Sequence, residues 1–259
     1  MTKKPANHQS ASSPLKKLLL KTGLLGAFIG VFITIEFLII RFNGSAVPVP
    51  VIPRAMTVLG HGKTLTYAVL GDSTTVAQGA SYGEGYAYMS AKHLARHYSV
   101  HFINAGVSGA KAADVASLQV AQVVRYAPDV ALLAVGANDV TGLTRISSVE
   151  HSLQQAIDAL RAANPVVKII VTGAPDMGSV PRLPWPVRQL VGLRTQAVNH
   201  MVERLVASNN LVFARIAEKT GPAFAADAGL FAADKFHPNA HGYALWTPVI
   251  NEALDTAIH

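Results

Sequence analysis

Five short apolar segments alternate with segments of helix length, and this alternation constrains the fold more than any other feature of the chain. The predicted strands are residues 65–70, 100–104, 130–135, 167–172 and 211–216. The predicted helices are residues 85–98, 112–126, 147–163 and 187–208, with a last helix after Asn239. Short strands that alternate with helices of this length are typical of a parallel sheet with helices on both faces. We therefore predict an α/β fold: a three-layer, doubly wound, five-stranded parallel sheet.

The first 56 residues differ in character from this domain. Residues 1–17 are polar and basic and are predicted to be a cytosolic tail. Residues 18–41 are mostly apolar and long enough for one transmembrane helix. Residues 42–56 contain three prolines and are predicted to be an extended linker, which leaves residues 57–259 as the main domain.

The apolar segment has two interpretations. It is longer than the core of a signal peptide, which favours an uncleaved signal anchor. Cleavage near Ala46, after the small residues Gly44 and Ser45, is the alternative and would release a secreted domain. Both interpretations place the domain outside the cytoplasm, because the lysines of the tail stay inside.

Charge and cysteine content exclude several function classes. The chain has a net charge of +7, but six of its 22 Lys/Arg and one of its 15 Asp/Glu lie in residues 1–45. The domain is therefore nearly neutral, and we expect no nucleic-acid partner. The absence of cysteine excludes disulfides, thiolate catalysis and cysteine-ligated zinc.

Polar residues follow the first three predicted strands. The clusters are Gly71-Asp72-Ser73, then residues 104–109, then residues 136–139. Because the carboxyl ends of parallel strands meet at one edge of a sheet, where such folds bind their ligands, these clusters are expected to lie together.

The polar clusters contain the side chains that acyl transfer needs. Ser73 can act as nucleophile and His237 as base. Asp234 precedes His237 by three residues, so in a tight turn its carboxylate can orient the imidazole. Donors for the oxyanion are available from the backbone N–H of Ser73, the backbone N–H of Gly106 and the amide of Asn138.

These four blocks together resemble the SGNH (GDSL) hydrolases over about residues 64–256. They are Gly71-Asp72-Ser73, Gly106, the Gly136/Asn138 pair and the Asp234/His237-Pro238 turn. The resemblance implies a flavodoxin-like sheet, a serine esterase or lipase activity without a cofactor, and the roles just given. It also implies that Asp72 is a structural neighbour of the nucleophile and not the acid of the triad. Thr74 departs from the family pattern, which has leucine there.

Other motifs have competing interpretations. Residues 79–83 fit the Gly-x-Ser-x-Gly elbow around Ser81, but no strand leads directly into them. The pairs His93/His97 and His237/His241 have metal-ligand spacing but lack the glutamate of a zinc-protease motif, so we predict no metal. Asp139, Asp114 and Asp176 are predicted to brace loops or helix starts.

The substrate is predicted only as a class. Residues 173–186 form a long loop after the fourth strand, and it is either a pocket wall, a membrane-facing lip or ordinary loop packing. The candidate substrate contacts are Asp72, Thr74, Met177, Val180 and Trp185. The predicted function is hydrolysis of small-molecule, lipid or glycan acyl or acetyl esters. The alternatives are acyl transfer to, or deacetylation of, envelope glycans, and a non-catalytic envelope module.

Overall fold

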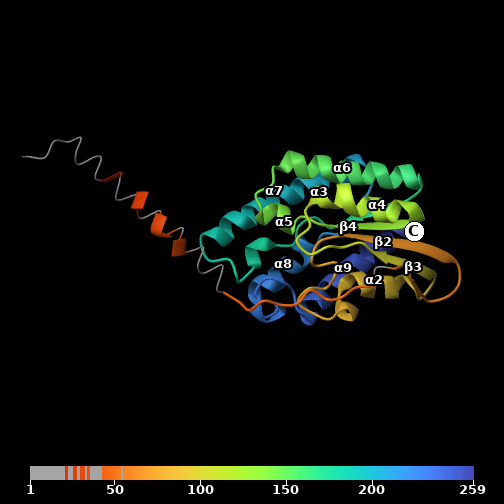
Figure 1. Cartoon of the computed structure of the whole chain (residues 1–259), viewed down its shortest axis with the longest axis horizontal. Helices are drawn as coiled ribbons and strands as arrows, with labels where there is room; N and C mark the ends of the chain where they lie inside the picture. The colour runs from red at the N-terminus through yellow and green to blue at the C-terminus, as the bar shows by residue number, and fades with distance from the viewer. Residues whose placement is uncertain (1–20, 23–25, 28–29, 33, 36–42, 54) are drawn as a thin grey trace, which may run out of the picture. The chain divides into compact units, whose positions relative to one another are not determined.

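The computed structural model describes residues 21–22, 26–27, 30–32, 34–35, 43–53 and 55–259 (Figure 1). The chain divides into two units, Met1–Phe42 and Asn43–His259. In the first unit the described residues are helical. Within the described residues, none of the helices combines the length and the apolar character that a membrane crossing needs. Most of the predicted span at residues 18–41 lies outside the described residues, so the transmembrane helix stays a prediction.

The second unit is built on a six-stranded sheet. Its strands are β1 (Thr57–Leu59), β2 (Thr64–Gly71), β3 (Ser99–Asn104), β4 (Val130–Ala134), β5 (Lys168–Val171) and β6 (Val212–Phe213). They lie in the order β1-β3-β2-β4-β5-β6. Strands β2 to β6 pair in parallel, whereas β1 pairs antiparallel with β3. The α/β fold is thus confirmed, but the prediction of five all-parallel strands is wrong: a three-residue edge strand is too short to show a period in the sequence.

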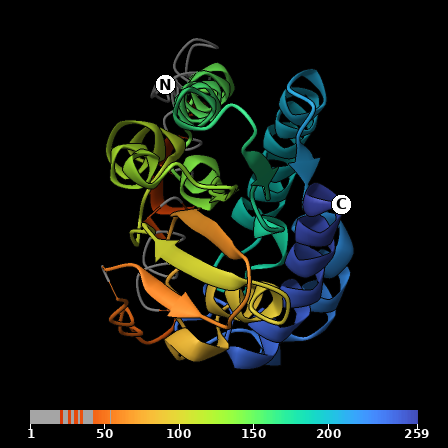
Figure 2. The same cartoon turned by 90° about the vertical axis from the view of Figure 1, so that its right-hand side faces the viewer.

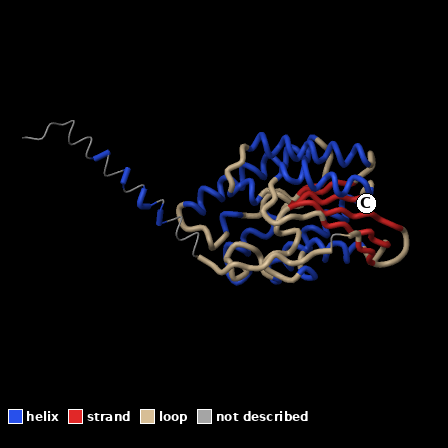
Figure 3. Tube along the Cα trace, in the orientation of Figure 1, coloured by secondary structure: helices blue, strands red, loops and turns tan. Residues whose placement is uncertain are grey.

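Helices cover both faces of the sheet (Figures 1 and 2). One face carries α3 (Ala112–Asp114), α4 (Val120–Val123), α6 (Ile146–Ala163) and α7 (Val187–Ser208); the other carries α2 (Tyr86–Leu94), α8 (Ile216–Ala226) and α9 (Ala240–Ile258). A short helix, α5 (Ala137–Thr141), follows β4. Figure 3 shows the strands between the helices and loops gathered at one end of the sheet. Strand β4 is buried at every residue, as expected of a strand covered on both faces.

One predicted helix differs from the observed structure, and one observed helix was not predicted. The helix predicted over residues 112–126 is broken into α3, a π-helical turn (Val115–Gln119), α4 and a 3-10 turn (Val124–Tyr126). Helix α8 was not predicted, because Gly221 and Pro222 lie inside it and both residues disfavour helix.

The π-helical turn serves the end of β2. It ends at Gln119, whose buried amide accepts from the N–H of Gly71 at 2.7 Å and donates to its carbonyl at 2.9 Å. Both backbone groups of Gly71 are therefore held where the strand ends. Irregular turns of this kind are common next to functional sites.

The register brings the ends of three strands together. Gly71 pairs with Ala134 of β4, and Val69 pairs with Asn104 of β3. Because β3 and β4 lie on opposite sides of β2, the chain reverses direction across the sheet at this strand. This reversal is the topological switch point, the place where open α/β sheets bind ligands.

Candidate active site

The turn after β2 carries Ser73. A Cβ on Gly71 would lie 2.0 Å from the carbonyl oxygen of Ala134, so only glycine allows the two strands to approach this closely. Next in the chain, Oδ1 of Asp72 accepts from the N–H and the hydroxyl of Thr74, both at 2.9 Å. The Asp72 carboxylate thus holds the turn that presents Ser73 at the switch point.

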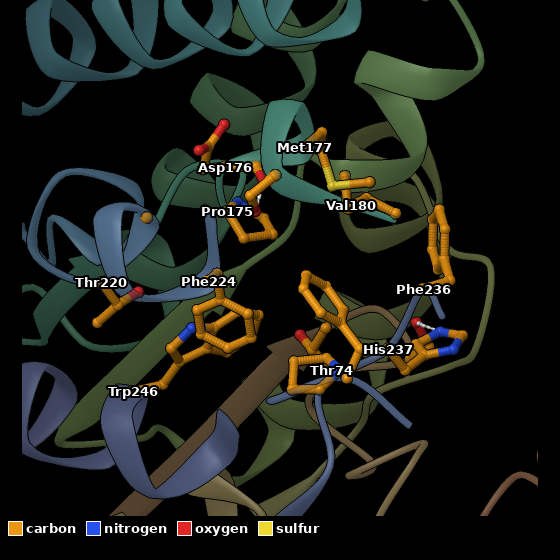
Figure 4. A pocket seen from close by; sticks show the side chains of 16 residues that line it. Thr74, Pro175, Asp176, Met177, Val180, Thr220, Phe224, Phe236, His237 and Trp246 are labelled. Carbon is orange, nitrogen blue, oxygen red and sulfur yellow. Dashed lines mark hydrogen bonds between the residues drawn. The ribbon is translucent and has the colours of Figure 1, made fainter. Parts of the chain in front are cut away.

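The structure brings Ser73 together with two residues from the far end of the chain. Nε2 of His237 lies 2.9 Å from Oγ of Ser73, and Nδ1 of His237 lies 2.5 Å from Oδ2 of Asp234. Figure 4 shows the hydrogen bond at the His237 ring as a dashed line. A hydroxyl, an imidazole and a carboxylate in one hydrogen-bonded series form the geometry needed to activate a serine.

The Asp234 carboxylate is held by its own turn. Oδ1 accepts from the backbone N–H groups of Phe236 and His237, both at 3.0 Å, while Oδ2 faces the imidazole. Burial by itself would raise the pKa of Asp234, but the hydrogen bonds from the His237 ring and from the two backbone N–H groups outweigh it, so the pKa lies below its ordinary value. The carboxylate therefore stays ionised opposite the imidazole.

Asp72 is the wrong group to orient the base, despite being adjacent to the serine. It is 2% exposed, and burial raises its pKa against the lowering effect of the Thr74 hydrogen bonds. Its Oδ1 is used by Thr74, whose hydroxyl in turn lies 3.0 Å from that of Tyr86. Asp72 is therefore a support for the turn, as the family resemblance implied.

The predicted oxyanion donors have different surroundings. Asn138, in α5, is half-buried and donates one amide N–H to the carbonyl of Ala110 at 3.0 Å. The N–H of Gly106 donates to Oδ1 of Asn104 at 3.0 Å, and a Cβ at Gly106 would lie 1.8 Å from Oγ1 of Thr75. The close approach of Thr75 is therefore enough to explain why position 106 is glycine, and no catalytic role is needed for that explanation.

Gly109 offers a third N–H that sequence reasoning missed. It has φ +84°, its surroundings are open, and it immediately precedes Ala110, the residue that Asn138 contacts. Among the described residues, no acceptor is seen for the N–H of Gly109 or of Ser73. The second glycine of the Gly-x-x-Gly spacing at residues 106–109 was the signal in the sequence.

A small apolar cavity opens beside Ser73 and His237. Its volume is about 30 Å³. Met177 and Val180 of the loop after β5 form one wall, and Phe224 and Trp246 lie at the end away from His237 (Figure 4). The remaining lining residues are Ser73, Thr74, Ala137, Pro175, Asp176, Ser179, Thr220, Gly221, Phe231, Phe236, His237 and Pro238.

Three of the five predicted substrate contacts line this cavity: Thr74, Met177 and Val180. Asp72 lies beneath the turn and is not part of the lining. Trp185 is 69% exposed and also lies outside the lining. The loop at residues 173–186 therefore contributes a pocket wall through its first half, where Met177 and Val180 are buried.

The competing motifs do not converge on Ser73. Ser81 is exposed, and its hydroxyl donates to Glu84 at 2.5 Å in a short 3-10 turn. His93 contacts Asp255 at 2.8 Å, which joins α2 to α9. His97 and His241 are exposed. Asp139 accepts from the N–H of Ala112 at 2.9 Å and so braces the start of α3, whereas the sequence had suggested a contact within the loop after the third predicted strand.

Comparison with known proteins gives the family. Residues 69–245 match the model of the GDSL-like lipase/acylhydrolase family. The chain belongs to this family. The resemblance to SGNH (GDSL) hydrolases is thereby confirmed, and the matched segment contains all four sequence blocks.

Relatives of this GDSL-family chain are named as esterases. It is 30% identical over 195 residues to the GDSL-like esterase Rv1075c of Mycobacterium tuberculosis, a match that covers 73% of this chain and 62% of the relative. It thus spans less than two thirds of that relative's length. Among solved structures, TesA matches with a TM-score of 0.62 at 19% identity, over 74% of this chain and 99% of TesA. A variant of the acetyl-xylooligosaccharide esterase Axe2 from Geobacillus Stearmophilus matches with a TM-score of 0.60 at 19% identity, over 76% and 95%. Both structures support the fold.

Proposed function

We propose that this GDSL-family chain hydrolyses carboxylic esters through a Ser73–His237–Asp234 triad. The hydrogen-bonded series from Ser73 Oγ through His237 to Asp234 carries the proposal. His237 takes the proton of Ser73 as the hydroxyl attacks the ester carbonyl, and Asp234 stabilises the imidazolium. The alcohol leaves with that proton, and a water molecule, activated by His237, then releases the acid from the acyl-enzyme.

The negative oxygen formed on attack needs donors that are aimed at it before reaction. We assign this role to the N–H of Ser73 and to the second amide N–H of Asn138, since the first is used by Ala110. The predicted third donor, Gly106, already donates to Asn104, so Gly109 is the better candidate for that position. Each such donor contributes about 3–4 kcal/mol of transition-state stabilisation.

The cavity favours a short acyl group. A space of about 30 Å³ has room for only two or three water-sized groups, because one such group needs about 10–15 Å³. The aromatic side chains of Phe224 and Trp246 are buried and close its far end. The chemical class proposed is therefore an acetyl ester or another ester of about two to four acyl carbons.

An ester series tests this proposal. With p-nitrophenol as leaving group, we expect kcat/KM to be at least about tenfold higher for the acetate or butyrate than for the octanoate. Each methylene group that the cavity cannot hold loses about 1–3 kcal/mol of transition-state binding energy. A second series keeps the acetyl group and lengthens the alcohol. Equal rates along the first series, with a steep fall along the second, would assign the cavity to the alcohol instead.

A second candidate is deacetylation of, or acyl transfer to, an envelope glycan. A larger cavity of about 440 Å³ shares Asp176 and Gly221 with the small one, and its lining includes the polar side chains of Gln196, Asn199 and Glu203. Such a lining suits a polyhydroxylated alcohol. Product analysis with an acetylated oligosaccharide, with and without a sugar acceptor, separates hydrolysis from transfer.

We propose further that residues 18–41 anchor the enzyme in a membrane with residues 43–259 on the extracytoplasmic side. The support is the basic tail and apolar run of the sequence. In cells, we expect the full chain to stay in the membrane fraction after a carbonate wash and its domain to be digested by protease from the outer side. Release as a soluble protein with a new amino terminus near Ala46 would instead support the cleaved form.

A further inference from the structure

The segment Asn43–Val47, here called the strap, lies against the loops of the candidate active site. The N–H of Ser45 donates to the carbonyl of Ala233 at 2.9 Å. At Gly44, which has φ +115°, an added Cβ would lie 2.4 Å from the carbonyl oxygen of Asp234. The backbone of the strap therefore packs directly on the residue that orients the base, and only glycine fits there.

Asn43 joins two of these loops through one amide group. Its Nδ2 donates to the carbonyl of Pro181 at 3.1 Å, in the loop that follows the pocket wall. Its Oδ1 accepts from Nζ of Lys235 at 2.8 Å. The loops are also joined directly, because the N–H of Arg182 donates to the carbonyl of Lys235 at 3.0 Å. Asn43 thus completes a bridge between the pocket loop and the Asp234–His237 turn.

Lys235 has the least favourable backbone conformation in that turn. It has φ +55°, a left-handed conformation that is unfavourable for a residue with a side chain. It lies between Asp234 and His237, so relaxation of its backbone would move the carboxylate relative to the imidazole. A contact that fixes the Lys235 side chain therefore also helps to fix the geometry of the turn.

The geometry points to Asn43 as a positioning residue for the Asp234–His237 pair, acting through Lys235; this inference rests on the proposed function. This inference gives the strap a role in turnover, although Asn43 lies 30 residues before Ser73 in the sequence. It also bears on two features of the sequence. Asn43-Gly44-Ser45 matches the N-glycosylation pattern Asn-x-Ser, but the Asn43 amide is already used in the contacts with Pro181 and Lys235. Cleavage after Ala46 would separate Asn43 and Gly44 from the domain.

The test compares two asparagine variants of the full chain. Asn164 is a matched control, because its Nδ2 donates to the carbonyl of Pro128 at 3.0 Å and it is likewise half-buried, but it lies next to the start of β5, at the opposite end of the strands from Ser73. We expect Asn43→Ala to lower kcat for p-nitrophenyl acetate about tenfold with little change in KM. Asn164→Ala should leave kcat within about twofold of wild type at a similar loss of thermal stability.

A double-mutant cycle with Lys235 distinguishes a positioning role of Asn43 from a general loss of stability. In a Lys235→Ala background, Asn43→Ala should lower kcat much less than it does alone, because the contact it breaks is already absent. Asn43→Asp, which keeps the acceptor for Lys235, should recover most of the lost kcat and serves if the alanine variant folds poorly.

Additive effects of Asn43→Ala and Lys235→Ala, or equal kcat losses for the Asn43 and Asn164 variants, would overturn the inference. Failure of the proposed function gives a different result: wild type and Ser73→Ala would then have the same rate.

Discussion

Replacement of Ser73 by alanine is expected to lower kcat for ester hydrolysis by about 10⁴- to 10⁶-fold, close to the rate left by binding and oxyanion donors alone. The alanine variant has no nucleophile, and the imidazole 2.9 Å away is left without a hydroxyl to deprotonate. Folding should be little affected, because one buried hydroxyl is removed without creating a large cavity. Steady-state kinetics with p-nitrophenyl acetate, together with a thermal melt, measure both effects.

Ser81→Ala is the matched control for this result. Ser81 is the serine of the competing Gly-x-Ser-x-Gly pattern, but it is exposed and donates to Glu84. Its variant should keep wild-type kcat, and a fluorophosphonate probe should label wild type and Ser81→Ala but not Ser73→Ala. Full activity in Ser73→Ala would remove the triad proposal.

Asp234→Asn is expected to lower kcat by about 10⁴-fold while leaving the nucleophile and base in place. The amide can still accept from the N–H of Phe236 or His237, so the turn keeps part of its hydrogen bonding. It cannot both accept from those groups and accept from Nδ1 of His237, which favours the wrong tautomer of the imidazole. Asp227→Asn is the control, since Asp227 accepts from Gly229 in a similar but exposed turn.

The same substitution has a predicted pH dependence. Because the pKa of Asp234 is lower in the folded chain than in the unfolded chain, its carboxylate stabilises the fold above the unfolded pKa of about 4. That contribution is lost as the pH falls through the lower, folded pKa. In urea unfolding, the gap in stability between wild type and Asp234→Asn should be largest at neutral pH and shrink below about pH 4. A gap independent of pH would show that the carboxylate charge does not contribute.

The layer architecture was predictable because each strand and each long helix has its own local pattern. The apolar run that ends at Leu70 and the continuous apolar run of β4 indicate strands that are covered on both faces. Helix α7 was predicted with its observed bounds, Val187–Ser208. Strand β1 and helix α8 were missed for opposite reasons: β1 is set by pairing with β3, a long-range effect, and α8 contains residues that locally disfavour helix.

The candidate site was predictable where chemistry selects the residue type, and less so where packing does. Ser73, Asp234 and His237 are reactive side chains at strand or turn ends, and the structure brings them into contact. A glycine has no side chain whose chemistry indicates a role. The sequence therefore could not distinguish Gly106, which packs against Thr75, from Gly109, which has open space around it. The role of Asn43 depends on a contact across 192 residues of sequence, which no local pattern contains.

The separation of Ser73 from His237 by 164 residues has a consequence for biosynthesis. A chain that has emerged only as far as α8 already contains Ser73, the proposed oxyanion donors and all six strands of the sheet, but neither Asp234 nor His237. Helix α9, which directly follows the base in the chain, also packs on α2 and on β5. Under the proposed mechanism, ester hydrolysis therefore requires that the chain has been made beyond His237, up to the start of α9. Before that point, the nascent chain is expected to leave esters intact.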